Sequence, residues 1–114
     1  MSNLSSSGPR RPILVLVTAS ESEAAGLART LVEEGLAACV NRVAVASTYR
    51  WKETVETEDE TLLIIKTADD CAAALEKRVQ ELHSYEVPEF VVLEPAAVSD
   101  TYLDWLLSAV TASQ

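Results

Sequence analysis

The chain has 114 residues, 48% of them hydrophobic, and 18 acidic residues against 9 lysines and arginines give a formal net charge of −9 at pH 7. This length predicts a single domain with a core of its own. The negative charge disfavours nucleic acid and anionic membrane surfaces as partners, because both are negatively charged themselves. No apolar run approaches the roughly 18 residues needed to cross a bilayer, so we expect no membrane insertion.

The two cysteines, Cys39 and Cys71, show no CxxC or other paired spacing. They therefore indicate neither a disulfide framework nor a zinc site, and we expect a cytoplasmic location. The first twelve residues, MSNLSSSGPRRP, are rich in Ser, Pro and Arg and contain no apolar stretch typical of a signal peptide. They predict a flexible tail over residues 1–12, followed by the folded domain over residues 13–114.

Regular patterns begin at Ile13. The run ILVLVTA is typical of a strand buried on both faces. Ser20 and Glu23 have the spacing of a capping box, and apolar residues at helical spacing then predict a helix that stops at Gly35. Residues 37–51 alternate with a period of two and predict one long, half-buried strand. One face of that strand carries Cys39, Val43, Val45, Tyr49 and Trp51.

The second half of the chain continues the pattern. The run LLIIKT predicts a strand, reached through the acidic residues 53–60, and Asp69 or Asp70 is suited to cap a second helix that ends near His83. Pro88 precedes a predicted last core strand, EFVVLEP, and Ser99 or Asp100 can cap a short C-terminal helix. The resulting β-α-β-β-α-β order predicts an α+β, ferredoxin-like sandwich with an extended β-hairpin.

The length of the hairpin strand also bears on assembly. About 15 residues at roughly 3.3 Å each span about 50 Å, whereas a 100-residue domain has a radius of gyration of about 13 Å. The hairpin must therefore overhang its own sheet or bend sharply. Overhanging strand edges are commonly paired or covered, so we expect a homo-oligomer joined by these strands. A bulge that folds the strand back on its own domain is the alternative.

Five segments, in this order, resemble the CutA divalent-cation tolerance family: LVEEGLAACVN, STYRW, LLIIKT, ELHSYEVPEF and YLDWL. The resemblance covers nearly all of residues 13–110. It implies a ferredoxin-like subunit, a tight homotrimer built by strand pairing between subunits, and an architecture akin to that of PII signalling proteins. It also implies a link to tolerance of copper and other divalent metals. The chain has no GxSxG, HExxH or P-loop motif, and we expect it not to be an enzyme.

The chain departs from the family pattern at two places. It has Trp51-Lys52-Glu53 where the family usually has Trp-x-Gly, and His83-Ser84-Tyr85 where His-Pro-Tyr is common. A cysteine and a second histidine have been proposed as metal ligands in some members. The matching positions here are Val17 and Leu82, so only His83 is left of that set.

His83 is the candidate metal ligand, with Glu86 or Glu89 nearby, and copper is favoured by the general affinity order of divalent ions. A structural role at a helix end is the alternative, because the helix dipole favours histidine there. A thiol near a helix N-terminus, such as that of Cys71, can have a lowered pKa.

The aromatic residues of the resembling segments predict a second kind of site. Tyr49, Trp51 and Tyr85 could line an amphipathic pocket with Lys66 as its cation, and packing across a trimer interface is the alternative. Cys39 and Glu89 complete the candidates for this ligand cleft, although a cysteine on an apolar strand face is usually a small core residue. The sequence leaves two functions open. One is a trimeric metal-tolerance protein that binds copper or another divalent ion, and the other is a PII-like module that binds a small-molecule effector between subunits.

Overall fold

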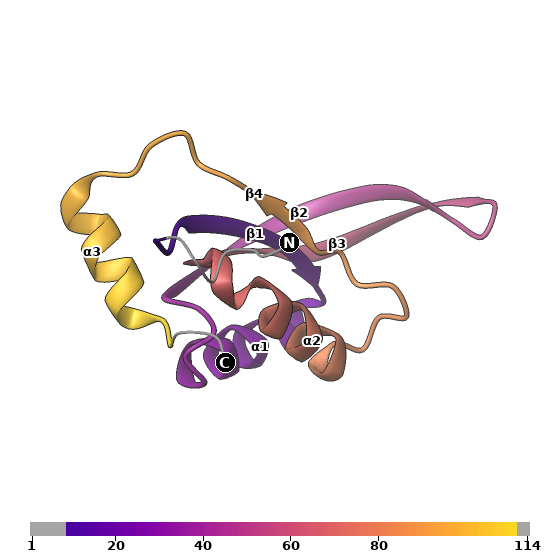
Figure 1. The fold of residues 1–114 in the computed structure, drawn as a ribbon. Helices are drawn as coiled ribbons and strands as arrows, with labels where there is room; N and C mark the ends of the chain where they lie inside the picture. The colour runs from indigo at the N-terminus through magenta and orange to yellow at the C-terminus, as the bar shows by residue number, and fades with distance from the viewer. Residues whose placement is uncertain (1–8, 112–114) are drawn as a thin grey trace.

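The structure is a computed structural model that describes residues 9–111. Two helices lie together on one side of a four-stranded antiparallel sheet, a long hairpin projects from one end, and a third helix stands at the other end (Figure 1). The predicted α+β ferredoxin-like fold with an extended hairpin and a short C-terminal helix is confirmed. The elements in chain order are β1 (Pro12–Ala19), α1 (Glu21–Glu33), β2 (Cys39–Trp51), β3 (Thr54–Ala68), the 3-10 turn η2 (Asp69–Cys71), α2 (Ala72–Leu82), β4 (Val91–Leu93) and α3 (Asp100–Ala109).

The core lies between the sheet, whose strand order is β2-β3-β1-β4, and the helices α1 and α2. Alternate residues of β1 are buried and face the helices, whereas Leu14 and Leu16 between them are only half-buried. The prediction that this strand is buried on both faces is therefore wrong within one chain. Each large apolar side chain that is fully buried contributes roughly 1.5–3 kcal/mol. The largest contributors are Val15, Val17, Leu31, Leu63, Ile65, Leu75 and Val79.

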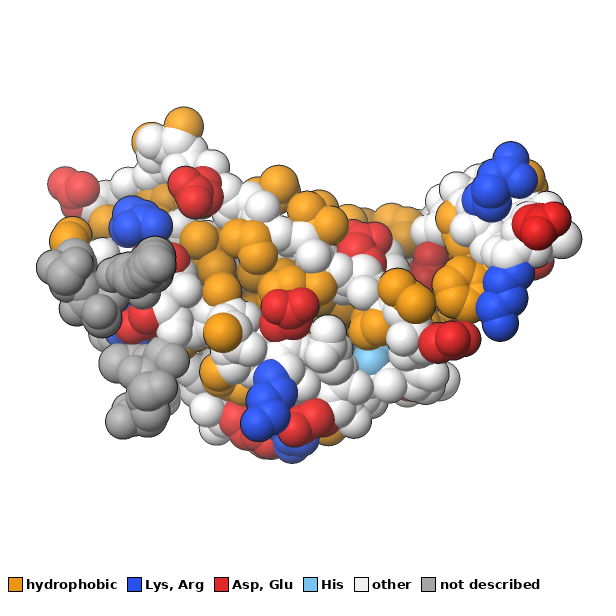
Figure 2. Space-filling model, turned by 45° about the vertical axis from the view of Figure 1, so that its right-hand side comes forward, with side chains coloured by type: hydrophobic (Ala, Val, Ile, Leu, Met, Phe, Trp, Pro, Cys, Tyr) orange, Lys and Arg blue, Asp and Glu red, His pale blue; other side chains and the backbone are white. Residues whose placement is uncertain are grey.

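The sheet face that points away from α1 and α2 carries the other alternate residues of the strands, and most of these are half-buried or exposed, with Glu60 and Ala68 as buried exceptions. We call this the helix-free face. Figure 2 shows hydrophobic side chains along the hollow between the body and the projecting hairpin. The register places these apolar residues on the helix-free face: Leu14, Leu16, Val43, Val45, Leu62, Ile64, Val91 and Leu93.

The hairpin formed by β2 and β3 is longer than the rest of the sheet. Its register runs from Cys39 opposite Lys66 to Trp51 opposite Thr54, while β1 pairs only with residues 61–68 of β3. The remainder overhangs, and the molecule measures 45 × 28 × 26 Å. Residues 53–60, expected as an acidic connection, contain the tip of this hairpin and the first half of β3. The alternative of a strand that folds back on its own domain is not what the structure shows.

The hairpin turns through two residues at its tip. Lys52 and Glu53 both have left-handed backbone angles, with φ of +48° and +72°. A two-residue turn of this handedness matches the twist of paired strands and normally favours glycine or asparagine. A tight turn therefore forms although Glu53 stands where the family usually has glycine.

At two helix starts, the hydrogen bonds differ from the predicted side-chain caps. Ser20 occupies the N-cap of α1, but its side chain makes no capping bond, and the Glu23 carboxylate instead accepts a hydrogen bond from Ser84 Oγ. Asp69 and Asp70 do not cap α2, because they lie in η2. The predicted stop of α1 at Gly35 is confirmed by its φ of +75°.

Arg10 and Arg11 hold the start of β1 to the rest of the domain. Arg11 N–H donates to Asp69 Oδ1 at 2.8 Å, and Arg10 Nε donates to Asp70 Oδ2 at 2.9 Å. Arg10 and Arg11 are therefore bonded to the domain, although the predicted tail includes them. Residues 1–8 of that tail and residues 112–114 lie outside the described part of the chain.

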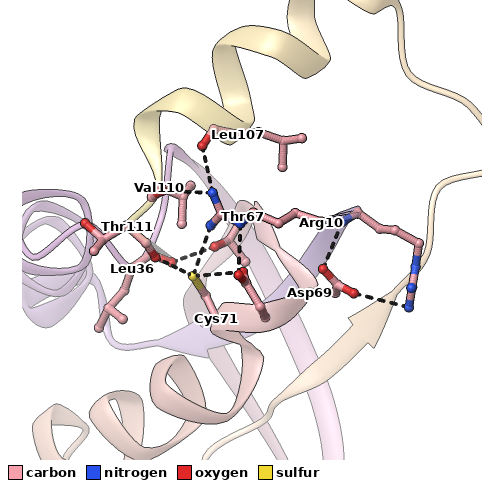
Figure 3. Close-up of polar contacts among 10 residues, drawn as sticks. Arg10, Leu36, Thr67, Asp69, Cys71, Leu107, Val110 and Thr111 are labelled. Atoms are coloured by element: carbon pink, nitrogen blue, oxygen red, sulfur yellow. Dashed lines mark hydrogen bonds and ion pairs between the residues drawn. The ribbon is translucent and has the colours of Figure 1, made fainter. Parts of the chain in front are cut away.

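The Arg10 guanidinium also reaches the C-terminal end of α3 (Figure 3). Its Nη1 donates to the carbonyl oxygens of Leu107 and Val110, at 3.0 and 3.2 Å. Carbonyls in the last turn of a helix have no partner within the helix, so Arg10 caps α3 from outside. The buried Cys71 thiol beside it donates to the Thr111 carbonyl at 3.0 Å. We call this arrangement the Arg10 clasp.

The last strand is shorter and more exposed than expected. Only Val91–Leu93 pair with β1, opposite residues 14–16, and all three side chains are exposed. The predicted core strand EFVVLEP is therefore a short edge strand. No helix within residues 9–111 is long and apolar enough to cross a membrane.

Candidate functional site

A cleft of about 980 Å³ opens on the helix-free side, between the overhanging hairpin and the loop that follows α2. We call it the hairpin cleft. Alternation along the strands turns the side chains of Tyr49, Trp51 and Glu60 to this side of the hairpin. The cleft is lined by Thr18, Ser47, Thr48, Tyr49, Arg50, Trp51, Glu56, Glu58, Glu60, Tyr85, Glu86, Val87, Pro88 and Glu89.

The lining combines aromatic rings with negative charge. Three of the described lining residues are aromatic, five are glutamates, and Arg50 is the single basic residue among them. A pocket of this size with apolar walls and a few converging polar groups is typical of small-molecule sites. Its charge favours ligands that carry positive charge.

Two tyrosines are fixed in the cleft by hydrogen bonds to β3. Tyr49 Oη donates to Glu58 Oε1 at 2.8 Å, and Tyr85 Oη donates to Glu60 Oε1 at 2.9 Å. The bond to Glu58, with some desolvation, raises the pKa of Tyr49 to about 12. Burial and then the bond to Glu60 raise the pKa of Tyr85 as well. Both phenols are therefore neutral donors at pH 7, and their rings are held in place.

His83 lies behind the cleft and is 8% exposed. Its Nδ1 accepts a hydrogen bond from Tyr85 N–H at 3.1 Å, so the ring proton sits on Nε2, which donates to the Thr18 carbonyl at 2.7 Å. Both ring nitrogens of this candidate metal ligand are therefore hydrogen-bonded in this conformation. His83 instead fixes the backbone at Tyr85 through the bond to its N–H. The ring centroids of His83 and Tyr85 lie 4.4 Å apart.

The loop after α2 has further anchors. Ser84 Oγ donates to the Glu23 carboxylate at the start of α1, and this bond is the main reason why the pKa of Glu23 is lowered. Lys52 Nζ at the hairpin tip lies 4.0 Å from Glu86 Oε1 in the loop. Where the family commonly has a proline, Ser84 thus holds the loop by a hydrogen bond.

The structure brings together four of the six predicted cleft residues. Tyr49, Trp51, Tyr85 and Glu89 all line the hairpin cleft. Cys39 and Lys66 lie opposite each other at the far end of the hairpin, and Lys66 Nζ donates to Asn41 Oδ1. Six residues of strand, roughly 20 Å, separate Lys66 from Glu60. Within one chain, Lys66 is not the cation of this cleft.

Sequence reasoning missed the glutamates of β3 as lining residues. Glu56, Glu58 and Glu60 recur with a period of two, which places them on one face of a strand. That alternation was the available signal, but the absence of a strong hydrophobic pattern in residues 53–60 hid the strand.

The described residues of a single chain form no metal site with several ligands. Within residues 9–111, no group of three or more His, Cys, Asp or Glu side chains could hold a metal ion. Cys39 is half-buried and Cys71 is buried. Burial raises the pKa of the Cys71 thiol, contrary to the lowering expected near a helix start.

The fold and the cleft together define a ferredoxin-like protein. Its overhanging hairpin borders a cleft of the size that a small-molecule ligand needs. The chain belongs to the CutA1 divalent ion tolerance protein family, whose model matches residues 13–109. The divalent-cation tolerance protein CutA of Thermus thermophilus is 44% identical over 95 residues, which cover 82% of this chain and 92% of that protein. The chloroplastic protein CutA of Arabidopsis thaliana is also 44% identical, over 82% of this chain and 53% of that protein.

Solved structures of the family have the same fold. The PII-like protein CutA from Nostoc superimposes with a TM-score of 0.85 at 36% identity, covering 88% of this chain and 98% of that one. The Thermus thermophilus protein superimposes with a TM-score of 0.84 at 44% identity, covering 88% and 99% of the two chains. The predicted membership of the CutA family is confirmed, and the PII-like character of the fold with it.

Proposed function

We propose that the protein works as a PII-like homotrimer in the response to divalent metal ions, with the hairpin cleft as its ligand site and without catalysing a reaction. The observation that carries this proposal is the cleft itself. It is large, aromatic and open on the helix-free side of the sheet, where a second copy would close it.

Two features support assembly through the hairpin. The strands at both edges of the sheet, β2 and β4, have one side without a strand partner among the described residues. The apolar side chains of Val43, Val91 and Leu93 are each more than 40% exposed. Exposed edges and an apolar face of this kind are normally covered in a soluble protein.

We further propose that His83 can bind copper, but only after a change in its hydrogen bonds. A metal can reach a ring nitrogen only after His83 releases Tyr85 N–H or the Thr18 carbonyl. Binding would therefore be weak and coupled to movement of the loop that lines the cleft. The cytoplasmic location also stays a prediction, since one relative is named chloroplastic and a similar structure, from Archaeoglobus fulgidus, is named periplasmic.

Calorimetric titration with Cu²⁺, Zn²⁺ and ATP tests which ligand the trimer accepts. We expect Cu²⁺ binding at pH 7.5 that weakens at pH 5.5 and is lost in His83→Ala. Tyr85→Leu, which removes an aromatic ring from the cleft, should weaken binding of an organic ligand. It should leave the hydrogen bond between His83 Nε2 and the Thr18 carbonyl in place. Equal Cu²⁺ binding by the wild type and His83→Ala at both pH values would remove His83 from the proposal.

A further inference from the structure

The hairpin cleft already holds a positively charged group of this chain at its mouth. Lys52 Nζ lies 5.4 Å from the centroid of the Trp51 ring and 4.0 Å from Glu86 Oε1. Trp51 and Glu86 both line the cleft, and they come from opposite sides of it, the hairpin and the loop after α2. An ammonium group between an aromatic face and a carboxylate is a recognised arrangement for binding organic cations.

The ion pair between Lys52 and Glu86 is exposed to solvent and therefore weak. The side chains of Lys52 and Glu86 are 71% and 72% exposed, and exposed ion pairs of this kind contribute little to stability. A ligand with the same chemistry can therefore displace Lys52 at small cost. The deeper lining is fixed, because Tyr49 and Tyr85 are hydrogen-bonded to Glu58 and Glu60.

The charge of the cleft decides between classes of ligand. Five glutamates and one arginine line it, and Glu60 is only 7% exposed. A phosphate or carboxylate ligand would meet like charges at short range, which is unfavourable. An alkylammonium group offers a charge to the glutamates and a hydrocarbon stem to the rings of Trp51 and Tyr85.

We infer that the hairpin cleft binds a small organic cation, an ammonium group on an apolar stem, and that Lys52 occupies the cation position when the cleft is empty. The inference rests on the proposed function in one respect, namely that the hairpin cleft is the ligand site. It adds the chemical class of the ligand and gives Lys52 the role of an internal competitor.

Butylammonium chloride is the probe, because it reproduces the stem and charge of a lysine side chain. The neutral analogue 1-butanol and equal concentrations of sodium chloride are the controls for apolar binding and for ionic strength. Fluorescence is read in a Trp105→Phe background. Trp51 and Trp105 are the two tryptophans, and Trp105 lies on α3, outside the cleft.

We expect a saturable change in Trp51 fluorescence with butylammonium and a much weaker one with 1-butanol. Lys52→Gln should lower the dissociation constant by roughly two- to fivefold, the value of one exposed cation–aromatic contact. Glu86→Gln should raise it by a similar factor. Lys77→Gln, which removes the same charge from the exposed side of α2, should leave it unchanged.

Three results would overturn the inference. These are no saturable response to butylammonium, an equal response to 1-butanol, or the same effect from Lys52→Gln as from Lys77→Gln. ATP and Zn²⁺ are titrated in parallel to separate this failure from that of the proposed function. A saturable Trp51 response to either, with none to butylammonium, leaves the cleft as a ligand site but contradicts the cationic class. No response to any of them contradicts both.

Discussion

Tyr49 and Tyr85 make the same kind of hydrogen bond to a glutamate of β3, but in different surroundings. Tyr85 bonds to Glu60, which is 7% exposed, whereas Tyr49 is itself 37% exposed and bonds to Glu58 near the hairpin surface. A buried charged acceptor that loses its donor is costly, while an exposed one is solvated by water.

Replacing each tyrosine by phenylalanine therefore separates the two sites. Tyr85→Phe should lower the free energy of unfolding by about 1–3 kcal/mol, because Glu60 keeps its charge and loses its donor. Tyr49→Phe should have a clearly smaller effect. Urea denaturation followed by circular dichroism measures both, and equal losses would show that the surroundings of Glu60 do not matter.

Because the pKa values of Tyr49 and Tyr85 are raised, we expect the protein to lose stability at alkaline pH. Their pKa values are raised in the folded state, to about 12 for Tyr49, above the value of about 10 in an unfolded chain. Their contribution is therefore fully present below about pH 10 and is lost as the pH rises through the folded pKa values. The difference in unfolding free energy between the wild type and Tyr85→Phe should shrink above pH 10. A difference that stays constant up to pH 12 would contradict this.

At the level of elements, the strained part of the hairpin is its tip. Glu53 has a φ of +72°, and a left-handed conformation costs a residue with a Cβ roughly 1–2 kcal/mol. Glu53→Gly should therefore stabilise the protein by about 1 kcal/mol, with a higher midpoint of urea denaturation. Glu53→Ala removes the carboxylate but keeps the Cβ and serves as the control. Equal midpoints for the glycine and alanine variants would show that backbone strain is not the cause.

The Arg10 clasp is the second element-level device, because it ties α3 to the start of β1. The side chains of Arg10 and Asp70 are 26% and 20% exposed, whereas that of Arg11 is 59% exposed. Arg10→Met should lower the free energy of unfolding by about 1.5–3 kcal/mol, since it removes the charged donor from Asp70 and from the α3 carbonyls. Arg11→Met should cost less than about 1 kcal/mol.

The reactivity of the Cys71 thiol measures directly whether α3 stays docked. In a Cys39→Ser background, Cys71 is the only thiol, and it is 1% exposed beneath Arg10. Release of α3 in Arg10→Met should speed its reaction with a disulfide reagent under native conditions, whereas Arg11→Met should not. Unchanged reactivity in Arg10→Met would mean that α3 stays docked without the clasp.

The sequence predicted the elements with strong periodicity well and the polar ones poorly. The continuous apolar run of β1, the alternation in β2 and the Gly35 stop identified their elements correctly, because burial imposes a regular pattern. The first half of β3 is mostly charged and polar, since the overhanging hairpin has no core of its own beneath it. The capping box of Ser20 and Glu23 does not form, and the Glu23 carboxylate is instead bonded to Ser84, which is distant in sequence. Asp69 does not cap α2 because it lies in η2, where its carboxylate accepts a hydrogen bond from Arg11 N–H.

The candidate site shows the same limit. Tyr49, Trp51, Tyr85 and Glu89, which the sequence suggested as cleft candidates, line one cleft in the structure. The separation of Lys66 from them follows only from the strand register, and the hydrogen bonds that occupy both nitrogens of His83 follow only from the path of the loop. The spacing of nearby residues in the sequence predicts neither the position of Lys66 nor the hydrogen bonds of His83.

For the whole molecule, one chain leaves an apolar, helix-free face and a projecting hairpin exposed to solvent. We propose that three copies cover these surfaces and close the hairpin cleft. The most direct test is the molar mass in solution by light scattering at micromolar concentration. We expect three times the 12.3 kDa of one chain, with dissociation promoted by Trp51→Ala and by Ile64→Glu. A stable mass of one chain would contradict it.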